Sequence, residues 1–459
     1  MTDSHSDTIA AIATASGAAG VGIIRVSGDL SLAIANAIAK TPSPYQARHL
    51  HYTQFFHPHT KAFIDEGCLI YCPGPKSFTG EDVIEFHCHG SPLVLQQLLR
   101  ACLAEGARLA HAGEFSKRAL MNGKIDLSKA EALIDLIEAD SNMAMQISLS
   151  KVQGQLYQHI QSARAALMHL LQHIEASIDF PDEVEGITEP EFYEAIAPAQ
   201  KLLDDAHNLK DFGRRVKSGT RAIILGYPNV GKSSLFNRLL GESRAIVSQT
   251  AGTTRDYIET DIELGGLLFH LFDTAGFRSE TSDDIEVAGI QKISQLKDES
   301  DVLIWVLDGT RELCTDEQRF LGELPDYDGE VLILINKRDH EDFDLTHIPQ
   351  DPLSAWPQLI ISTQNTEDIS ALKSEVLKLV PAPSSEQHWA VVCNTRQLAC
   401  LDMAQAHMTD LIEHYKAQHP HDLLAVDIKA CIAKLGEITG DDLTEEVLDG
   451  VFSRFCVGK

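Results

Sequence analysis

Residues 226–234, Gly-Tyr-Pro-Asn-Val-Gly-Lys-Ser-Ser, constrain the fold of this chain more than any other stretch. They match the phosphate-loop pattern G-x-x-x-x-G-K-[ST]. The apolar run 221–225 before them is typical of a strand, and residues 234–240 after them have helical apolar spacing. Glycines let the backbone wrap a phosphate closely, with its amides at a helix N-terminus that favours anions. We therefore predict a nucleotide-binding strand–loop–helix unit; the alternative is a glycine-rich turn in an ordinary βα unit.

Within this loop, Lys232 is expected to reach the outer phosphates of a nucleotide, and the Ser233 hydroxyl to hold Mg²⁺. The predicted nucleotide contacts of the loop are Asn229, Val230, Gly231, Lys232, Ser233 and Ser234.

Two motifs that sense the γ-phosphate follow in the order that a GTPase requires. The threonine loop 250–256 can bring a hydroxyl to Mg²⁺, for which we predict Thr254. The apolar run 268–272 leads into Asp273-Thr-Ala-Gly276, the pattern D-x-x-G. Asp273 can hold Mg²⁺ through water, and the Gly276 amide can sense the phosphate. The predicted contacts here are Ser248, Gln249, Thr250, Ala251, Gly252, Thr253, Thr254, Asp273, Thr274, Ala275 and Gly276.

Two further motifs predict recognition of guanine. The apolar strand 331–335 ends in Asn336-Lys337-Arg-Asp339, the pattern N-K-x-D. The Asp339 carboxylate can accept from guanine N1 and the exocyclic amine, and adenine offers neither donor, so GTP is selected. The last strand and loop supply Ser362, Thr363 and Gln364, where a backbone amide could meet guanine O6. Each motif follows a predicted strand, which indicates a parallel sheet with ligands at the carboxyl ends.

The composition of the chain limits its class and its partners. Its 459 residues suffice for about three domains. No apolar stretch of about eighteen residues occurs, so we expect no membrane helix. Nine scattered cysteines and an N-terminus without a basic and then apolar segment indicate free thiols in a cytoplasmic protein. The formal net charge of −29 argues against a broad nucleic-acid-binding surface, so any RNA contact must be local or supplied by a partner.

Periodicity divides the chain into four segments. Residues 1–120 are predicted to form a mixed α/β domain, 121–215 a first helical segment, 216–380 the nucleotide domain and 381–459 a second helical segment. The economical architecture packs the two helical flanks into one bundle, with an α/β phosphate-loop domain inserted into it. Helical spacing runs from 126 to 178, and we interpret Gly213 to Gly219 as a linker.

Two polar runs stand out in the first 130 residues, 77–85 and 112–127, both dense in charge near glycines. They indicate either a functional site or two solvated turns with helix caps, and the residues alone leave this open. His87 and His89 with Cys68 and Cys72 suggest zinc, but the spacing fits no structural zinc pattern. We favour packed core residues over a metal site.

Several motifs together resemble the MnmE (TrmE) family, the bacterial and organellar tRNA-modification GTPases. They are residues 226–234, Ala-Gly-Thr-Thr-Arg-Asp at 251–256, Ser-Phe-Thr-Gly-Glu-Asp at 77–82, Gly-Glu-Phe-Ser-Lys-Arg at 113–118, and Phe-Cys-Val-Gly-Lys at 455–459. The last is the most specific, because other bacterial GTPases lack it. The chain departs from the family at Ser91, where a second glycine is common, and in Ser-Thr-Gln at 362–364.

The resemblance implies that the N-terminal domain is an α+β unit that binds folate and forms a homodimer. By motif position, contacts to 5-formyl- or methylene-tetrahydrofolate would fall on Arg25, Glu85, Lys124 and Lys459. The two polar runs would then be functional.

The resemblance also implies a partner and a reaction. The partner would be the flavoprotein MnmG, which holds FAD, in an expected heterotetramer. The pair would add an aminomethyl or carboxymethylaminomethyl group to carbon 5 of the wobble uridine of certain tRNAs. Cys456 occupies the family's position for a thiol near that chemistry, and the alternative is a buried terminal cysteine.

Phe277 directly follows D-x-x-G, so it cannot position water as a glutamine does in many GTPases. Asn229 could coordinate a monovalent cation beside the phosphates, which the resemblance suggests is K⁺. The remaining predicted K⁺ ligands are Ser248, Thr250 and Thr253. Glu286 matches the family's catalytic glutamate if the segment carries one extra residue, and the alternative is a solvated helix charge.

Two rival functions remain at this point. One is a ribosome-assembly GTPase that only binds RNA as a switch, for which a basic C-terminal domain would be expected. The other is a folate enzyme whose GTPase domain is purely regulatory.

Overall fold

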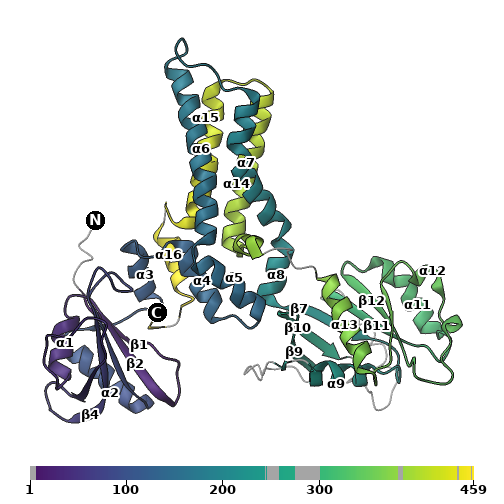
Figure 1. Ribbon diagram of the computed structural model, residues 1–459, viewed down its shortest axis with the longest axis horizontal. Helices are drawn as coiled ribbons and strands as arrows, with labels where there is room; N and C mark the ends of the chain where they lie inside the picture. Colours follow the sequence, from purple (N-terminus) through teal and green to yellow (C-terminus); the bar gives the residue numbers. More distant parts are fainter. Residues whose placement is uncertain are drawn as a thin grey trace. The chain divides into compact units, whose positions relative to one another are not determined.

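The computed structural model contains two compact units (Figure 1). One unit comprises Met1–Ile137, Lys151–Gln200 and Cys400–Lys459, and the other comprises Glu138–Ser150 and Lys201–Ala399. The structure describes residues 7–242, 244–245, 258–273, 300–380, 386–441, 444–455 and 457–458.

A six-stranded sheet forms the N-terminal part of the first unit, in the order β3-β4-β5-β2-β1-β6. The strands are β1 (Ile9–Ile12), β2 (Ala19–Ser27), β3 (His51–Phe56), β4 (Phe63–Cys72), β5 (Val83–Gly90) and β6 (Arg108–Leu109). Helices α1 (Ser31–Ile38) and α2 (Pro92–Ala104) cover one face, where Ile24 and Val26 of β2 are buried. Side chains alternate along a strand, so Arg25 lies on the opposite face. This arrangement confirms the predicted mixed α/β character.

The remaining helices of the first unit follow the N-terminal sheet in the sequence. They are α3 (Glu114–Met121), α4 (Leu127–Ile137), α6 (Gln155–Asp179), α15 (His421–Thr439) and α16 (Glu445–Phe452), with parts of α5 (Asn142–Val152), α7 (Glu189–Asn208) and α14 (Thr395–Lys416). Helices α6 and α15 pack side by side (Figure 1). Their buried stripes include Leu167 and Leu170 on α6 and Ile428 and Leu435 on α15, as the helical spacing predicts. The helical spacing predicted from 126 to 178 corresponds to three successive helices, α4, α5 and α6.

The predicted linker Gly213–Gly219 is wrong for most of its length, because residues 210–218 form helix α8 (Lys210–Ser218). Phe212 and Val216 lie one turn apart and are both buried in the core of the second unit. Arg214 and Lys217 are exposed. The basic residues thus occupy the outer face of an amphipathic helix, and their density in the sequence concealed the two apolar anchors.

A seven-stranded sheet forms the second unit, in the order β13-β12-β11-β7-β10-β9-β8. The strands are β7 (Thr220–Leu225), β8 (Arg244–Ala245), β9 (Ile258–Leu264), β10 (Leu267–Asp273), β11 (Val302–Asp308), β12 (Glu330–Asn336) and β13 (Gln358–Ile360). The strands β7, β10, β11, β12 and β13 run parallel, whereas β9 and β8 form an antiparallel edge. Every residue of β11 is buried, as expected for a central parallel strand covered on both faces.

Helices cover this sheet in the pattern of a doubly wound domain. Besides α8 they are α9 (Lys232–Glu242), α11 (Thr315–Glu323), α12 (Gln350–Leu353) and α13 (Thr366–Leu379). The predicted fold class, a phosphate-loop domain within a helical chain that begins with an α+β domain, is confirmed. Within the described residues, no helix combines the length and the apolar character that crossing a membrane requires.

Candidate functional site

The phosphate loop joins the end of β7 to the start of α9, as predicted. Gly226 and Gly231 adopt φ angles of +154° and +106°. A Cβ on Gly226 would lie 2.5 Å from the Val306 carbonyl oxygen, and one on Gly231 would lie 2.2 Å from Asn336 Nδ2. Both glycines are therefore required by backbone conformation and by the close approach of neighbouring strands.

The cationic side chain of the loop is already turned onto the loop backbone. Lys232 Nζ donates to the carbonyl oxygens of Gly226 at 2.7 Å and Tyr227 at 2.9 Å. Ser233 and Ser234 are exposed in the first turn of α9. The amine and a hydroxyl thus lie at a helix N-terminus, which is the arrangement that phosphate and its metal ion require.

Asn336 connects the loop to the two guanine motifs. Its side chain is 1% exposed, and Nδ2 donates to the Val230 carbonyl oxygen at 2.7 Å. Its Oδ1 accepts from the Thr363 amide at 3.2 Å. One buried amide therefore joins the phosphate loop, the end of β12 and the loop after β13.

The surroundings of Asp339 favour the ionised form of its carboxyl group. A hydrogen bond from the Ser362 hydroxyl holds the pKa of its carboxyl below the ordinary value. The Ser362 amide in turn donates to Asp368 Oδ2 at 2.7 Å, and the Gln364 amide donates to Ser362 Oγ at 3.2 Å. An ionised carboxylate is what two donors of a guanine edge would need.

Sequence reasoning missed Asp308, at the end of β11. Its Oδ2 lies 2.6 Å from Lys337 Nζ, and its Oδ1 accepts from the Thr310 amide at 3.0 Å and hydroxyl at 2.7 Å. Burial would raise the pKa of this carboxyl, but the hydrogen bonds from Lys337 and Thr310 lower it below the ordinary value. Lys337 has a φ of +69°. The available signal was an aspartate closing an apolar strand, as Asp273 closes β10.

Other predicted nucleotide residues lie outside the described residues. Asp273 is described through its backbone in β10. The nucleotide residues that lie outside the description are Ser248, Gln249, Thr250, Ala251, Gly252, Thr253, Thr254, Thr274, Ala275, Gly276 and Glu286. Cys456 and the predicted folate contact Lys459 also lie outside it. Their roles stay predictions.

A second polar site lies on the N-terminal sheet. Arg25 and Glu85 face each other in the register of β2 and β5, and Arg25 Nε donates to Glu85 Oε1 at 2.8 Å. His87 Nε2 lies 3.2 Å from Glu85 Oε2. The bond to His87, with help from Arg25 and against the effect of burial, lowers the pKa of Glu85 to about 2. This carboxylate is therefore ionised at neutral pH.

The end of the chain reaches this site. Val457 forms a β-bridge with Ala112, and Arg25 NH1 donates to the Gly458 carbonyl oxygen at 3.4 Å. Gly458 has a φ of +106°, and a Cβ there would lie 2.2 Å from the Ile12 carbonyl oxygen. The tail therefore packs against residues 1–120, up to Gly458.

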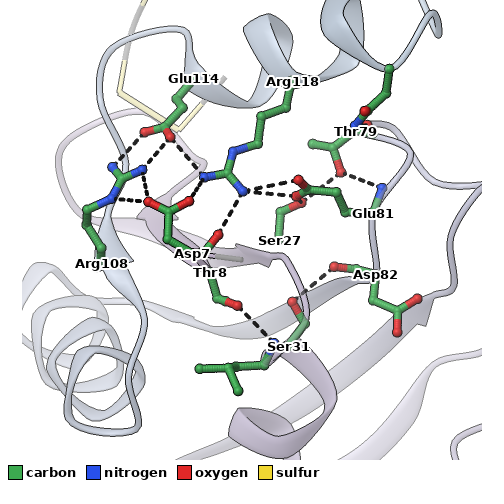
Figure 2. A network of polar contacts seen from close by, with 12 residues as sticks. Asp7, Thr8, Ser27, Ser31, Thr79, Glu81, Asp82, Arg108, Glu114 and Arg118 are labelled. Carbon is green, nitrogen blue, oxygen red and sulfur yellow. Dashed lines mark hydrogen bonds and ion pairs between the residues drawn. The ribbon is translucent and has the colours of Figure 1, made fainter. Parts of the chain in front are cut away.

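The two polar runs of the sequence meet in one network, which Figure 2 shows. Arg118 NH1 lies 3.2 Å from both carboxylate oxygens of Glu81, and Asn122 Nδ2 donates to the Thr79 carbonyl oxygen at 2.7 Å. Arg118 NH2 also donates to Asp7 at 2.7 Å and Glu114 at 3.0 Å.

Lys124 lies against the same loop, because a Cβ on Gly80 would be 2.9 Å from its Cε. The structure thus brings Arg25 and Glu85 into contact and places Lys124 beside the loop 77–82. The folate assignments remain predictions.

The histidines and cysteines near β5 do not gather. His89 Nδ1 lies 2.9 Å from Asp65 Oδ1, His87 contacts Glu85, and Cys88 is 4% exposed. In the parts of the chain that the structure describes, no group of three or more His, Cys, Asp or Glu side chains is placed to hold a metal ion.

Comparisons with known proteins cover almost the whole chain. The family model described as "MnmE helical domain" matches residues 127–456, and the one described as "GTP-binding protein TrmE N-terminus" matches residues 8–124.

Three curated relatives carry the name "tRNA modification GTPase MnmE". The protein of Acetivibrio thermocellus is 40% identical over 458 residues, that of Clostridioides difficile (strain 630) 37% over 465, and that of Alkaliphilus oremlandii 38% over 469. Each alignment covers 99% of both chains. Together with the phosphate loop and the guanine motifs at the strand ends, they show that the chain is a GTPase and belongs to the MnmE (TrmE) family of tRNA modification GTPases.

Proposed function

We propose that this chain, with an FAD-dependent MnmG-type partner, installs an aminomethyl or carboxymethylaminomethyl group at carbon 5 of the wobble uridine of certain tRNAs. GTP hydrolysis accompanies this step, and a tetrahydrofolate supplies the one-carbon unit. One observation supports the proposal: the same chain joins its phosphate loop to the N-K-x-D motif through Asn336 and also carries an Arg25–Glu85 ion pair that the tail reaches.

The nucleotide half acts through positioned donors. The loop amides and Lys232 bind the phosphates, and Asp339 accepts from the guanine edge. The exposed Ser233 hydroxyl, with Thr254 and Asp273, would hold Mg²⁺, which supplies positive charge at the phosphates when bound.

The folate half depends on charge. The Glu85 carboxylate suits the amine and ring N–H donors of a pterin, because two such donors match two carboxylate oxygens. Lys124 and Lys459 are cations suited to the carboxylates of the glutamate part of 5-formyl- or methylene-tetrahydrofolate.

The hydrolytic step would need charge that an arginine finger supplies elsewhere. Asn229 is exposed at the tip of the loop with a φ of +66°. With Ser248, Thr250 and Thr253 it would hold K⁺, which would supply positive charge to the phosphates when bound. Glu286 would orient water, and two nucleotide domains of a homodimer would pair. Cys456 would lie near the uridine chemistry.

The experiment that tests the function is wobble-uridine analysis of bulk tRNA from a deletion strain. We expect the modification to disappear and to return with the wild-type gene, but not with Lys232→Ala or Glu85→Gln. Intact modification together with defective ribosomal subunits would favour the ribosome-assembly alternative. If tRNA is fully modified in the strain that carries Lys232→Ala, the result would favour the alternative of a folate enzyme whose GTPase domain is purely regulatory.

A further inference from the structure

Phe78 is an exposed aromatic side chain in a tightly held loop. The loop connects β4 to β5, and 40% of Phe78 is exposed. Its neighbours are fixed: the Ser77 hydroxyl donates to the Glu81 carbonyl oxygen, and Thr79 Oγ1 lies 2.7 Å from Ser27 Oγ. Thr79 and Ser27 are completely buried. The backbone on both sides of the Phe78 ring is therefore held in place by side-chain hydrogen bonds.

The loop is also held from outside by α3 and the turn after it (Figure 2). Glu81 accepts from Arg118 at 3.2 Å and from Ser27 Oγ at 2.7 Å. Asn122 holds the Thr79 carbonyl oxygen at 2.7 Å. The position of the Phe78 ring is therefore set before any ligand binds, which reduces the entropic cost of binding.

The ring belongs to the Arg25–Glu85 site. The Arg25 guanidinium carbon lies 5.8 Å from the centroid of Phe78 and 5.6 Å from that of Phe115. Phe115 is fully buried, so only Phe78 of these two rings has an exposed surface. The same guanidinium donates to Glu85 at 2.8 Å. A partly exposed aromatic residue and an ionised carboxylate are thus linked through one arginine.

We propose that Phe78 is a stacking platform for the flat, amine-bearing half of the pterin ring, whose donor edge Glu85 accepts. This inference rests on the proposed folate function. A planar heterocycle with two adjacent N–H donors is the ligand chemistry that a carboxylate beside an aromatic face recognises. Stacking of a base-like ring on an aromatic side chain changes affinity by about tenfold when the aromatic side chain is removed.

The test is the binding of 5-formyl-tetrahydrofolate to the full chain, measured by titration calorimetry. Phe78→Leu keeps the apolar volume but removes the aromatic face, and we expect it to weaken binding about tenfold. Phe78→Tyr should bind within about twofold of wild type. The matched control is Phe63→Leu, since Phe63 is 56% exposed on β4 and contacts Phe56; it should bind as wild type does.

Two further ligands locate the contact. A free pterin should lose affinity for Phe78→Leu by a similar factor, whereas p-aminobenzoylglutamate should not. Equal binding of 5-formyl-tetrahydrofolate by wild type and Phe78→Leu would overturn the role of Phe78 alone. So would a loss that Phe78→Tyr shares and that comes with a lower thermal midpoint, which would make Phe78 structural. A wild-type chain that does not bind this folate would instead overturn the folate site, and the platform with it.

Discussion

Asn336 Nδ2 lies 2.7 Å from the carbonyl oxygen of Val230, so a single buried hydrogen bond couples the phosphate loop to the guanine motif. Neither half of the nucleotide site can shift without disturbing the other.

Replacing Asn336 by Ala should therefore damage both halves. The Val230 carbonyl would lose a buried donor at a cost of about 1–3 kcal/mol, and we expect GTP and GDP affinity to fall at least about tenfold. Fluorescent-nucleotide titration measures this. The control is Asn365→Ala, which removes the α13 cap bond to the Glu367 amide and should cost about 1 kcal/mol of stability without changing nucleotide affinity. Similar affinities for both variants would contradict the coupling.

Asp308→Asn tests whether the missed aspartate positions Lys337. The substitution keeps a side chain that can accept from Thr310 but removes the charge 2.6 Å from the Lys337 amine. Bonds between charged groups contribute about 1.5–3 kcal/mol, so we expect roughly tenfold weaker GTP binding. Glu375→Gln, in the more exposed pair with Lys378, is the control. If Asp308→Asn binds GTP as wild type does, Lys337 does not depend on this partner.

Asp339→Asn should exchange guanine for xanthine preference. The asparagine carbonyl cannot replace the carboxylate, but its amide can donate to the additional oxygen of xanthine. Competition binding with GTP and xanthosine triphosphate measures the ratio of the two affinities, which should shift towards xanthosine triphosphate. Unchanged guanine selectivity would remove Asp339 from base recognition.

Hydrolysis should be much faster in K⁺ than in Na⁺. Asn229→Ala should lose that difference, whereas Glu286→Ala should keep nucleotide binding and lose turnover. Phosphate release at matched ionic strength provides the rates. Equal rates in the two salts for the unmutated chain would refute the cation proposal, and a fully active Glu286→Ala would exclude that glutamate.

The lowered pKa of Glu85 predicts that the stability of the N-terminal sheet falls as the pH is lowered. Its pKa is lowered from 4.5 to about 2 in the folded chain, so its stabilising contribution is complete above pH 4.5 and lost as the pH falls towards 2. Allowing for partial exposure, this contribution is about 2 kcal/mol.

Hydrogen exchange of the β2 and β5 amides reports this local stability. At pH 6 these amides should be better protected from exchange in the wild type than in Glu85→Gln. The difference in protection should be smaller at pH 3. A constant difference between these pH values would mean that the charge of Glu85 contributes nothing.

The nucleotide site could be predicted because its residues lie in short contiguous motifs, each after an apolar strand. Asp308 could not be found from the sequence because its partner Lys337 is 29 residues away, directly after another strand, β12. The bond between Arg118 and Glu81 likewise joins residues 37 apart, which no local pattern reveals. Helix α8 was misjudged because charge density hid Phe212 and Val216, whose burial only the packed sheet explains.

The contact between Arg25 and Gly458 also determines when, during translation, the N-terminal site can be completed. These residues are 433 positions apart, so the bond cannot form until the last part of the chain has been translated. At about 5–20 residues per second, a ribosome needs roughly 20–90 s to cover that interval. While the ribosome makes the entire GTPase domain, the Arg25–Glu85 site of the N-terminal sheet therefore lacks its contact with the tail. A message that ends early would yield a chain with a nucleotide site but with an unfinished second site.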